Sequence, residues 1–500
     1  MAMVQKRQVF INAIMSIVQV VSLGGILFIF YRFLLATIGV EQLGVWSLVL
    51  ATTAVTRISD FGLSASVVKF VAKYVARGEH ETVAGIIQTA VLSIGTCTGL
   101  ILLALYPFAR WLLGLVVPGA ELESAVSILP FALVSLWLML ITGVFQSGLD
   151  GYQRTDLRSV LLIGGATFHF LLGFVLVPTY GLMGLAYAQV IQTSIVLVGS
   201  WLLLKRYLPI LPTIPCRWNY SLFREMIGYS ISFQAISIAQ MLYDPVTKWL
   251  LTRFGGLVMV GYYEVASRMV LQFRALIVAG NQVLVPAVAD LQEKKPEATQ
   301  VIYSNSYRLL IYLALPLYSI IVVCTPVISR LWIGHYEGMF VLFAILLATG
   351  WFLNTLNTPA YFVNLGTGEL RWNTISHIVI GLLNGGLGLL LGKLYGGVWV
   401  VVAWVFSLAI GSSMIALAYH LRHKISLSEL LPRESRMTAL ACVIGMLIAL
   451  LMYYSAYHLF SIITAGGLAL LLFLVVVAPS LWLHPMRKHL MGWIGQYLLK

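Results

Sequence analysis

The sequence predicts an all-α, polytopic membrane protein of about fourteen transmembrane helices, and three observations lead to this class. Of the 500 residues, 60% are hydrophobic and only 10% are charged, whereas soluble domains carry roughly a quarter charged residues. Apolar runs long enough to cross a bilayer alternate with short polar segments along the whole chain. The Lys and Arg residues gather in every second connecting segment, as they do in multi-pass membrane proteins.

Each predicted span is an apolar run bounded by polar or turn-forming residues. The run from Met183 to Leu204 contains no charged residue and is the clearest of them. The first run follows Lys6 and Arg7 but is too long for the apolar part of a signal peptide, so we predict a membrane helix there. The runs are 9–35, 43–68, 83–106, 125–147, 159–177, 182–204, 227–251, 257–288, 306–329, 338–362, 373–392, 396–419, 437–456 and 459–483.

The orientation follows from the basic residues. With the N-terminus in the cytoplasm, 21 of the 31 Lys and Arg residues fall on the cytoplasmic side. Only Arg110, Arg253, Arg330 and Lys393 fall on the opposite side. Positive charge is retained preferentially on the cytoplasmic side of a membrane. We therefore predict that both termini are cytoplasmic.

The composition also argues against several classes of function. The net charge of +13 comes from scattered basic residues rather than a basic tract, so we expect no nucleic-acid partner. The four cysteines are far apart and form no C-x-x-C pair, so we expect neither a disulfide framework nor a metal site. Phosphate-binding loops and metalloprotease motifs do not occur in the sequence. We expect no cofactor and no enzyme activity, the alternative being a membrane-embedded glycosyltransferase or polymerase.

A weak internal repeat relates the two halves of the chain at a spacing of about 216 residues. The matched segments share residue types and order: Arg32–Leu35 with Lys248–Leu251, Leu43–Trp46 with Val260–Tyr263, Arg57 with Arg274, and Tyr180-Gly181 with Tyr395-Gly396. A chance match between two apolar sequences is the alternative. Each repeat holds six predicted spans, and an even number gives both halves the same orientation, related by a pseudo-two-fold axis along the membrane normal.

The repeat and the polar segments together predict four parts. These are an N-terminal six-helix bundle at 1–204, a cytoplasmic linker at 205–226, a C-terminal six-helix bundle at 227–420, and an additional helix pair with a cytoplasmic tail at 421–500. We expect the linker segment from Trp218 to Met226 to lie along the membrane surface.

Six basic residues fall within or at the ends of predicted spans: Arg32, Arg57, Lys248, Arg268, Arg274 and Arg308. A charged side chain at the centre of a bilayer costs about 2.5–3.5 kcal/mol on insertion scales. These side chains must therefore face protein, water or a ligand rather than lipid. They are the most informative residues in the sequence.

Local pairing is one explanation for these charges. Asp60 follows Arg57 by three residues, whereas Asp244 and Glu264 each precede a basic residue, Lys248 and Arg268, by four. Residues at these spacings share a helix face and can form salt bridges.

The positions of the other charges suggest interfacial locations. Arg32 and Lys248 lie near helix ends, from which long side chains can extend to the membrane surface. Arg308 lies at a predicted helix start and is expected at the interface.

Arg274 differs because it has no acidic residue at helical spacing. Arg57 occupies the matching position in the other half, so the two arginines are expected to face each other across a central cavity. Guanidinium groups bind phosphate through two parallel hydrogen bonds, and a low dielectric strengthens that attraction. We predict that Arg57 and Arg274 hold a diphosphate headgroup, with Arg32 and Lys248 attracting it toward the outer side.

Several segments resemble the polysaccharide transporter branch of the multidrug, oligosaccharidyl-lipid and polysaccharide flippase superfamily, which includes O-antigen flippases. The resemblance extends over residues 9–420 and is carried by scattered segments: Gly39–Leu48, Ser59–Leu63 with Lys69 and Lys73, Gly181–Ala186, and Asp244 with Val260–Ala266. These segments resemble the family's loop before its second helix, the second helix itself, the turn into the sixth, and the seventh and eighth helices.

The resemblance implies a flippase that moves undecaprenyl-diphosphate-linked saccharides between the leaflets of the bacterial cytoplasmic membrane by alternating access. Related peptidoglycan-precursor flippases keep arginines in the second and eighth helices, which Arg57 and Arg274 match. They also bind a cation through an acidic residue of the seventh helix, for which Asp244 is the nearest candidate and Asn384 a partner. The partners implied are the lipid-linked saccharide, membrane lipids, and Na+ or H+.

The alternative within the same superfamily is a cation-coupled multidrug and toxin extrusion antiporter. Such a transporter exports mostly cationic compounds, which a cavity lined by arginines would repel. The carboxylates Asp60, Asp244 and Glu264 are the candidate drug-binding or ion-coupling groups in that case. The sequence does not indicate which saccharide is carried.

Overall fold

The computed structural model describes residues 2–54, 63–117, 119–281, 296–367, 369–456 and 460–488. Over these ranges the chain forms helices, and no described residue belongs to a β-strand. The predicted all-α class is confirmed. The helices cluster into two compact units, Met1–Gly261 and Tyr262–Lys500, and each unit is considered by itself below.

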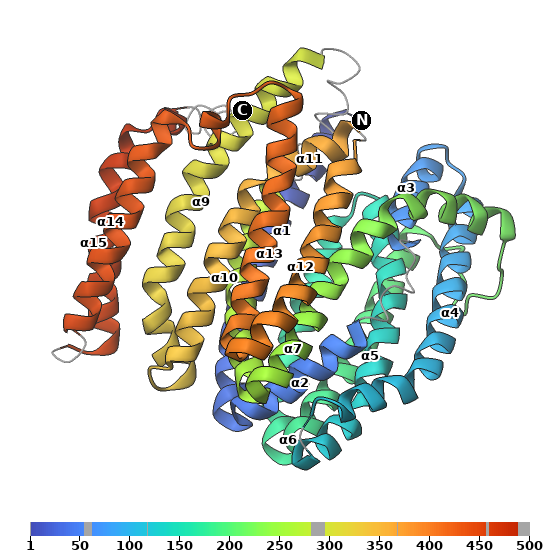
Figure 1. Cartoon of the computed structure of the whole chain (residues 1–500). Helices are drawn as coiled ribbons and strands as arrows, with labels where there is room; N and C mark the ends of the chain where they lie inside the picture. The colour runs from blue at the N-terminus through green and yellow to red at the C-terminus, as the bar shows by residue number, and fades with distance from the viewer. Residues whose placement is uncertain are drawn as a thin grey trace. The chain divides into compact units, whose positions relative to one another are not determined.

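Unit 1 consists of helices that pack around α5. They are α1 (Ala2–Thr37), α2 (Gly39–Ala54), α3 (Leu63–Ala76), α4 (His80–Gly114), α5 (Gly119–Gly151), α6 (Thr155–Tyr207) and the first part of α7 (Tyr220–Asn281) (Figure 1). Helix α5 contacts α3, α4 and α6, while α1 packs on α6. The core of this unit joins buried Val, Ile and Leu side chains of α3, α4 and α5 to Leu208 and Leu211 of the predicted linker.

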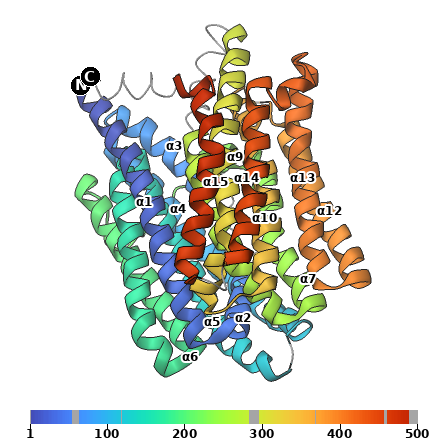
Figure 2. The same cartoon turned by 90° about the vertical axis from the view of Figure 1, so that its left-hand side faces the viewer.

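Unit 2 begins within α7 and contains the remaining helices. They are α9 (Pro296–Ile333), α10 (Gly338–Leu356), α11 (Thr358–Thr367), α12 (Arg371–Tyr395), α13 (Gly397–Arg422), α14 (Arg433–Ala456) and α15 (Ile462–Leu483). Helices α12 and α13 form one tightly packed pair, and α14 and α15 form another that lies against α9 (Figure 2).

The described residues of the fourteen predicted runs are helical except Asn357, Gly396, Phe460 and Ser461. Ten of the described helices are long and apolar enough to cross a membrane. The difference has three causes. The runs 159–177 and 182–204 both lie in α6, and the described parts of run 43–68 lie in α2 and α3, which are short. The two runs in α7 contain charged residues that lower their mean hydropathy.

Helix α6 folds back on itself at Gly181. The backbone there has φ 56° and ψ −133°, a conformation that glycine adopts without the steric penalty of a Cβ. A Cβ placed on Gly165 would contact Val196, and one on Gly199 would contact Leu161. These contacts pair residues at nearly equal distances before and after Gly181, so the two parts of α6 run antiparallel as two separate spans.

Positive φ angles recur at equivalent places in the two repeats. Gly181 and its predicted counterpart Gly396 both have positive φ, at 56° and 89°. Gly39 and Gly256 form a second such pair, 217 residues apart, with φ of 78° and 81°. Each of the four lies between two consecutive helical segments. This shared backbone geometry supports the duplication, whereas the four-part division and the symmetry axis stay predictions.

The matched segments Leu43–Trp46 and Val260–Tyr263 contain glycines that bring two backbones together. A Cβ on Gly44 would lie 2.1 Å from the carbonyl oxygen of Leu257, and one on Gly261 would lie 2.2 Å from that of Val40. The two contacts are reciprocal, because Val40 and Leu257 are themselves equivalent in the repeat. Glycine permits such close approach of helices in membrane proteins. The start of α2 therefore crosses α7 beside Gly256 within unit 1.

The predicted linker is held against α4 by hydrogen bonds. The side-chain oxygen of Gln88 accepts from the backbone N–H groups of Cys216 and Arg217, each at 3.3 Å. The indole nitrogen of Trp218 donates to the hydroxyl of Ser93 at 2.9 Å. These polar side chains of α4 are buried, so they satisfy linker backbone that would otherwise lack partners.

The glycine crossing gives the first prediction. Gly44→Ala and Gly261→Ala should each lower the stability of the purified protein by about 1–3 kcal/mol, because the added methyl group overlaps a backbone carbonyl. Gly25→Ala is the matched control, since it lies within α1 and a Cβ there has no atom within 4 Å. Thermal unfolding in detergent measures the effect. Unchanged melting of both crossing variants would show that the contact is not tight.

Candidate functional site

Two of the predicted site residues, Arg57 and Asp60, lie outside the described residues. The others fall in the described ranges, but they do not form a single site within either unit. Asp244, Lys248 and Glu264 are neutralised by local partners, whereas Arg32 is exposed and the guanidinium of Arg274 lies beside neutral groups.

Asp244 and Lys248 form the predicted i,i+4 salt bridge on the first part of α7. The Lys248 ammonium lies 2.6 Å from a carboxylate oxygen of Asp244. The Lys248 side chain is 3% exposed, whereas that of Asp244 is 49% exposed. Lys248 is therefore buried rather than extended to the surface. A buried ammonium requires a nearby counter-charge, and Asp244 supplies it.

Glu264 and Arg268 form the second predicted pair, in unit 2, with the burial reversed. The Arg268 Nε donates to a carboxylate oxygen of Glu264 at 2.7 Å. Here the carboxylate is buried, at 4% exposed, and the guanidinium is 45% exposed. The local explanation of these charges thus holds for both described pairs. The ion-coupling role predicted for Asp244 and Glu264 stays a prediction.

Arg308 and Arg32, two further basic residues of the predicted spans, are more exposed than Lys248. Arg308 pairs with Glu429 at 3.0 Å and with Glu434 at 3.3 Å, so it connects α9 to the segment that leads into α14. Arg32 is exposed on α1. The assignment of Arg32 and Lys248 to substrate binding stays a prediction.

Arg274 lies on the second part of α7 and contacts α10. Its Nη2 donates to the Oδ1 of Asn354 at 2.9 Å. Its guanidinium carbon lies 4.5 Å from the centre of the Trp351 ring, which is a cation–π contact. Among the described residues, no carboxylate lies within ion-pair distance of it. We call Arg274, Trp351 and Asn354 the Arg274 site.

Polar aromatic side chains from three further helices surround this site. Tyr318 of α9, Tyr361 of α11 and His377 of α12 lie within electrostatic range of the guanidinium. The Tyr318 hydroxyl is hydrogen-bonded to Thr355 at 2.9 Å. The Tyr361 and His377 rings meet edge to face at 5.8 Å. The guanidinium is thus held by groups that carry no negative charge.

Two buried donors of the Arg274 site have no hydrogen-bond acceptor among the described residues. They are the Nε of Arg274 and the indole Nε1 of Trp351. A buried donor left unsatisfied costs about 1–3 kcal/mol. One oxyanion can accept several hydrogen bonds and also neutralise the guanidinium. The chemistry of the site is therefore suited to a phosphate group or another anion with several oxygens.

Sequence reasoning identified Arg274 but not its surroundings. Trp351 and Asn354 are three residues apart and share one face of α10. The sequence contains that spacing, but it does not show that this face of α10 meets α7. Tyr318, Tyr361 and His377 carry no local signal, because aromatic residues are common at the ends of membrane helices.

The family model for polysaccharide biosynthesis proteins matches residues 9–292, more than half of the chain. The chain belongs to the polysaccharide biosynthesis protein family. The matched region contains Arg274 but ends before Trp351 and Asn354. The chain is also similar to a candidate O-antigen transporter of Shigella flexneri, 22% identical over 379 residues that cover 73% of this chain and 84% of that protein.

Solved structures of two functional classes share the fold of this family member. An inward-facing multidrug resistance MATE family transporter of the MOP superfamily has a TM-score of 0.71 at 14% identity, covering 82% of this chain and 98% of the other. The lipid II flippase MurJ in an inward closed conformation has a TM-score of 0.67 at 14% identity, covering 94% and 99%. At these identities the likeness establishes the fold and does not discriminate between drug and lipid transport.

The Asp244–Lys248 pair gives the second prediction. Asp244→Asn should destabilise the protein by about 3 kcal/mol, because it leaves the buried Lys248 ammonium without its carboxylate. The double variant Asp244→Asn/Lys248→Met should regain that stability, since Met fills a similar volume without a charge. Thermal unfolding measures both. A double variant that melts as early as the single one would contradict this account of the pair.

Glu429→Gln is the matched control for this test. Glu429 belongs to a more exposed pair with Arg308, in which the two side chains are 43% and 37% exposed. Exposed ion pairs contribute about 0–1 kcal/mol. Its melting temperature should therefore change much less than that of Asp244→Asn.

Proposed function

We propose that this protein is a flippase that moves polyprenyl-diphosphate-linked oligosaccharides across the bacterial cytoplasmic membrane by alternating access. The observation that carries the proposal is Arg274, whose buried guanidinium has neutral partners and no described carboxylate within ion-pair distance. The family membership and the similarity to a candidate O-antigen transporter support the same class of substrate.

The charge of the Arg274 site favours an anionic substrate over a cationic drug. A cation near an unpaired guanidinium in a low dielectric is repelled, while a phosphate is attracted and accepts its free donors. In the rival multidrug antiporter, a carboxylate would bind the cation. The described candidates Asp244 and Glu264 are already paired with Lys248 and Arg268, which weakens that alternative.

In the proposed cycle, the headgroup enters from the cytoplasmic leaflet and the polyprenyl tail stays in lipid. Arg57 and Arg274 hold the phosphates, while Arg32 and Lys248 attract them toward the outer side. A substrate can shift the balance between two conformations only through different affinities for them. We further propose that Na+ or H+ binding at Asp244, Asp60 or Glu264, or the membrane potential, favours return to the inward state. At Asp244 or Glu264 the cation would replace the paired Lys248 or Arg268 charge. We also propose that both termini are cytoplasmic.

Binding in lipid nanodiscs tests the substrate class and is the third prediction. The wild-type protein should bind an undecaprenyl-diphosphate-linked saccharide saturably, and the Arg57→Ala/Arg274→Ala variant should not. Arg274→Ala alone should weaken binding about 10- to 100-fold, the loss expected for one or two hydrogen bonds to a charged group. Arg253→Ala removes an exposed arginine and should bind as the wild type does.

The same titration with a cationic dye shows which result would contradict the flippase proposal. Dye binding that survives in the double variant, without preference for the diphosphate lipid, would assign the protein to the multidrug antiporters. The carboxylates Asp60, Asp244 and Glu264 would then be the candidate site. Transport by reconstituted Arg274→Ala at the wild-type rate would likewise remove Arg274 from the mechanism.

The unpaired indole of Trp351 gives the fourth prediction. Trp351→Phe keeps an aromatic ring beside Arg274 but removes the buried N–H donor. If this donor binds a phosphate oxygen, affinity for the diphosphate lipid should fall by a few-fold to about tenfold, as for a single hydrogen bond. Trp399→Phe is the control, because Trp399 is exposed on α13. Equal affinity for both variants and the wild type would exclude the indole from the site.

A further inference from the structure

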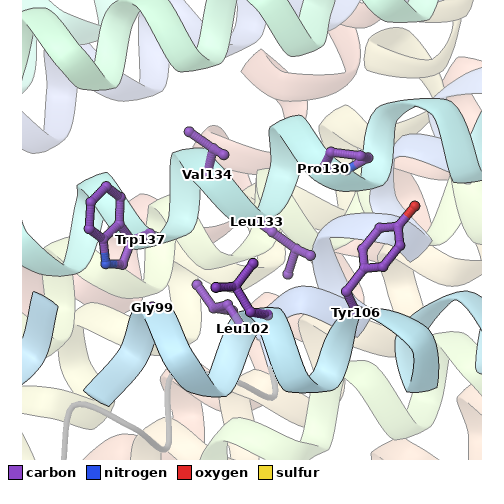
Figure 3. Close-up of a pocket in the computed structure, with 8 residues that line it drawn as sticks. Gly99, Leu102, Tyr106, Pro130, Leu133, Val134 and Trp137 are labelled. Carbon is purple, nitrogen blue, oxygen red and sulfur yellow. The ribbon is translucent and has the colours of Figure 1, made fainter. Parts of the chain in front are cut away.

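A groove runs between α4 and α5 in unit 1, and none of the residues assigned to transport lines it. Its inner part is a cavity of about 320 Å³, lined by Gly99, Leu102, Leu103 and Tyr106 of α4 and by Pro130, Leu133, Val134 and Trp137 of α5. The side chains of the two helices border the space between them (Figure 3). This lining is almost entirely apolar.

Two features of the sequence keep this groove open. Gly99 has no side chain, and the indole of Trp137 lies across it while donating to the Gly95 carbonyl at 2.8 Å. A Cβ on Gly99 would already lie 3.3 Å from that indole nitrogen. Pro130 lacks an N–H for the carbonyl of Val126, and proline within a helix bends it. Beyond the contact of Trp137 with Gly99, apolar side chains of both helices line the cavity.

A second cavity follows the first along the same two helices, toward the turn between them. Its volume is about 830 Å³, and its lining continues from Pro107 on α4 and from Ser127 on α5. Unlike the inner part, it contains one cationic side chain, Arg110, and one anionic side chain, Glu123. Both are exposed, and neither forms an ion pair with another described residue.

The dimensions of the groove match one leaflet of a bilayer. Gly99 and Arg110 are eleven positions apart on α4, which is about 16 Å at ~1.5 Å per residue. The hydrocarbon core of a bilayer is about 30 Å thick, so this length is about half of it. The predicted orientation places Arg110 on the outer side. The apolar part would then lie among the acyl chains of the outer leaflet, and Arg110 and Glu123 would lie at its headgroups.

The pair of opposite charges indicates the kind of headgroup. A phosphate suits Arg110, because guanidinium binds phosphate oxygens through parallel hydrogen bonds. A purely anionic headgroup would leave Glu123 facing a like charge. The ammonium of ethanolamine donates N–H hydrogen bonds that a carboxylate can accept, whereas the quaternary ammonium of choline has no N–H to donate. One phosphoethanolamine group thus complements both side chains.

We propose that the α4–α5 groove is a binding site for an outer-leaflet phospholipid with an ethanolamine headgroup. Its phosphate binds Arg110, its ammonium binds Glu123, and one acyl chain lies in the apolar cavity against Leu102 and Leu133. The amphipathic Trp111, which also lines the outer cavity, suits the boundary between acyl chain and headgroup. The site is separate from the Arg274 site and does not depend on the proposed transport function.

Native mass spectrometry of the purified full chain tests this fifth prediction. The protein is titrated with ethanolamine, glycerol and choline phospholipids that carry identical acyl chains. The wild type should bind the ethanolamine lipid about tenfold more tightly than the other two, the difference expected for one charge-assisted hydrogen bond. Equal retention of all three lipids would mean that the groove holds only bulk lipid, and would overturn the proposal.

Single variants test the phosphate contact and the ammonium contact separately. Arg110→Gln should weaken binding of all three lipids, because each carries the phosphate, while Glu123→Gln should remove only the preference for ethanolamine. Arg253→Gln is the matched control, because it removes another exposed arginine on the predicted outer side and should change nothing. Wild-type affinity in Arg110→Gln, an ethanolamine preference that persists in Glu123→Gln, or an equal loss in Arg253→Gln would contradict the assignment.

Gly99→Leu tests the apolar part of the site. The added side chain fills the groove and should weaken all three lipids together. The melting temperature of this variant reports whether it still folds. A folded Gly99→Leu protein that keeps the ethanolamine preference at full affinity would show that no acyl chain lies in the groove.

Discussion

The hydrogen-bonding requirement of the backbone is the constraint on which the rest of this structure depends. Within lipid, each peptide N–H and C=O needs a partner inside the protein, and helices provide it for almost every residue. The residue types that can stand where helices reverse direction or cross closely are therefore restricted. Glycines occupy them, with positive φ at Gly181 and Gly396 and at Gly39 and Gly256.

The same environment determines how charges are distributed. Lys248 and Glu264 are buried, and each has an opposite charge four residues away on its own helix. Such pairs form when the helix that carries them forms, and they do not depend on contacts with other helices. Arg274 has no such neighbour and depends on α10, so its guanidinium is positioned by tertiary structure.

The fold was largely predictable from the sequence, whereas the site was not. Apolar run length identified the helical segments, and the spacing of Asp244 and Glu264 to their basic partners identified two salt bridges, because these properties are local. The contact of Arg274 with Trp351 and Asn354 joins residues about 80 positions apart. No periodicity encodes such a contact. The groove between α4 and α5 could not be predicted for the same reason, since Gly99 and Pro130 line one cavity only because the two helices pack together.

The neutral partners of Arg274 are better suited to a transporter than a carboxylate would be. A buried guanidinium paired with a carboxylate must break that pair before it binds a phosphate, and breaking a buried pair costs about 3–5 kcal/mol. Asn354 and Trp351 instead orient the guanidinium while leaving its charge uncompensated and its Nε free. A phosphate can then bind without displacing a counter-ion. In the proposed cycle the same two contacts hold Arg274 after release, so no counter-ion has to leave it before the next substrate binds.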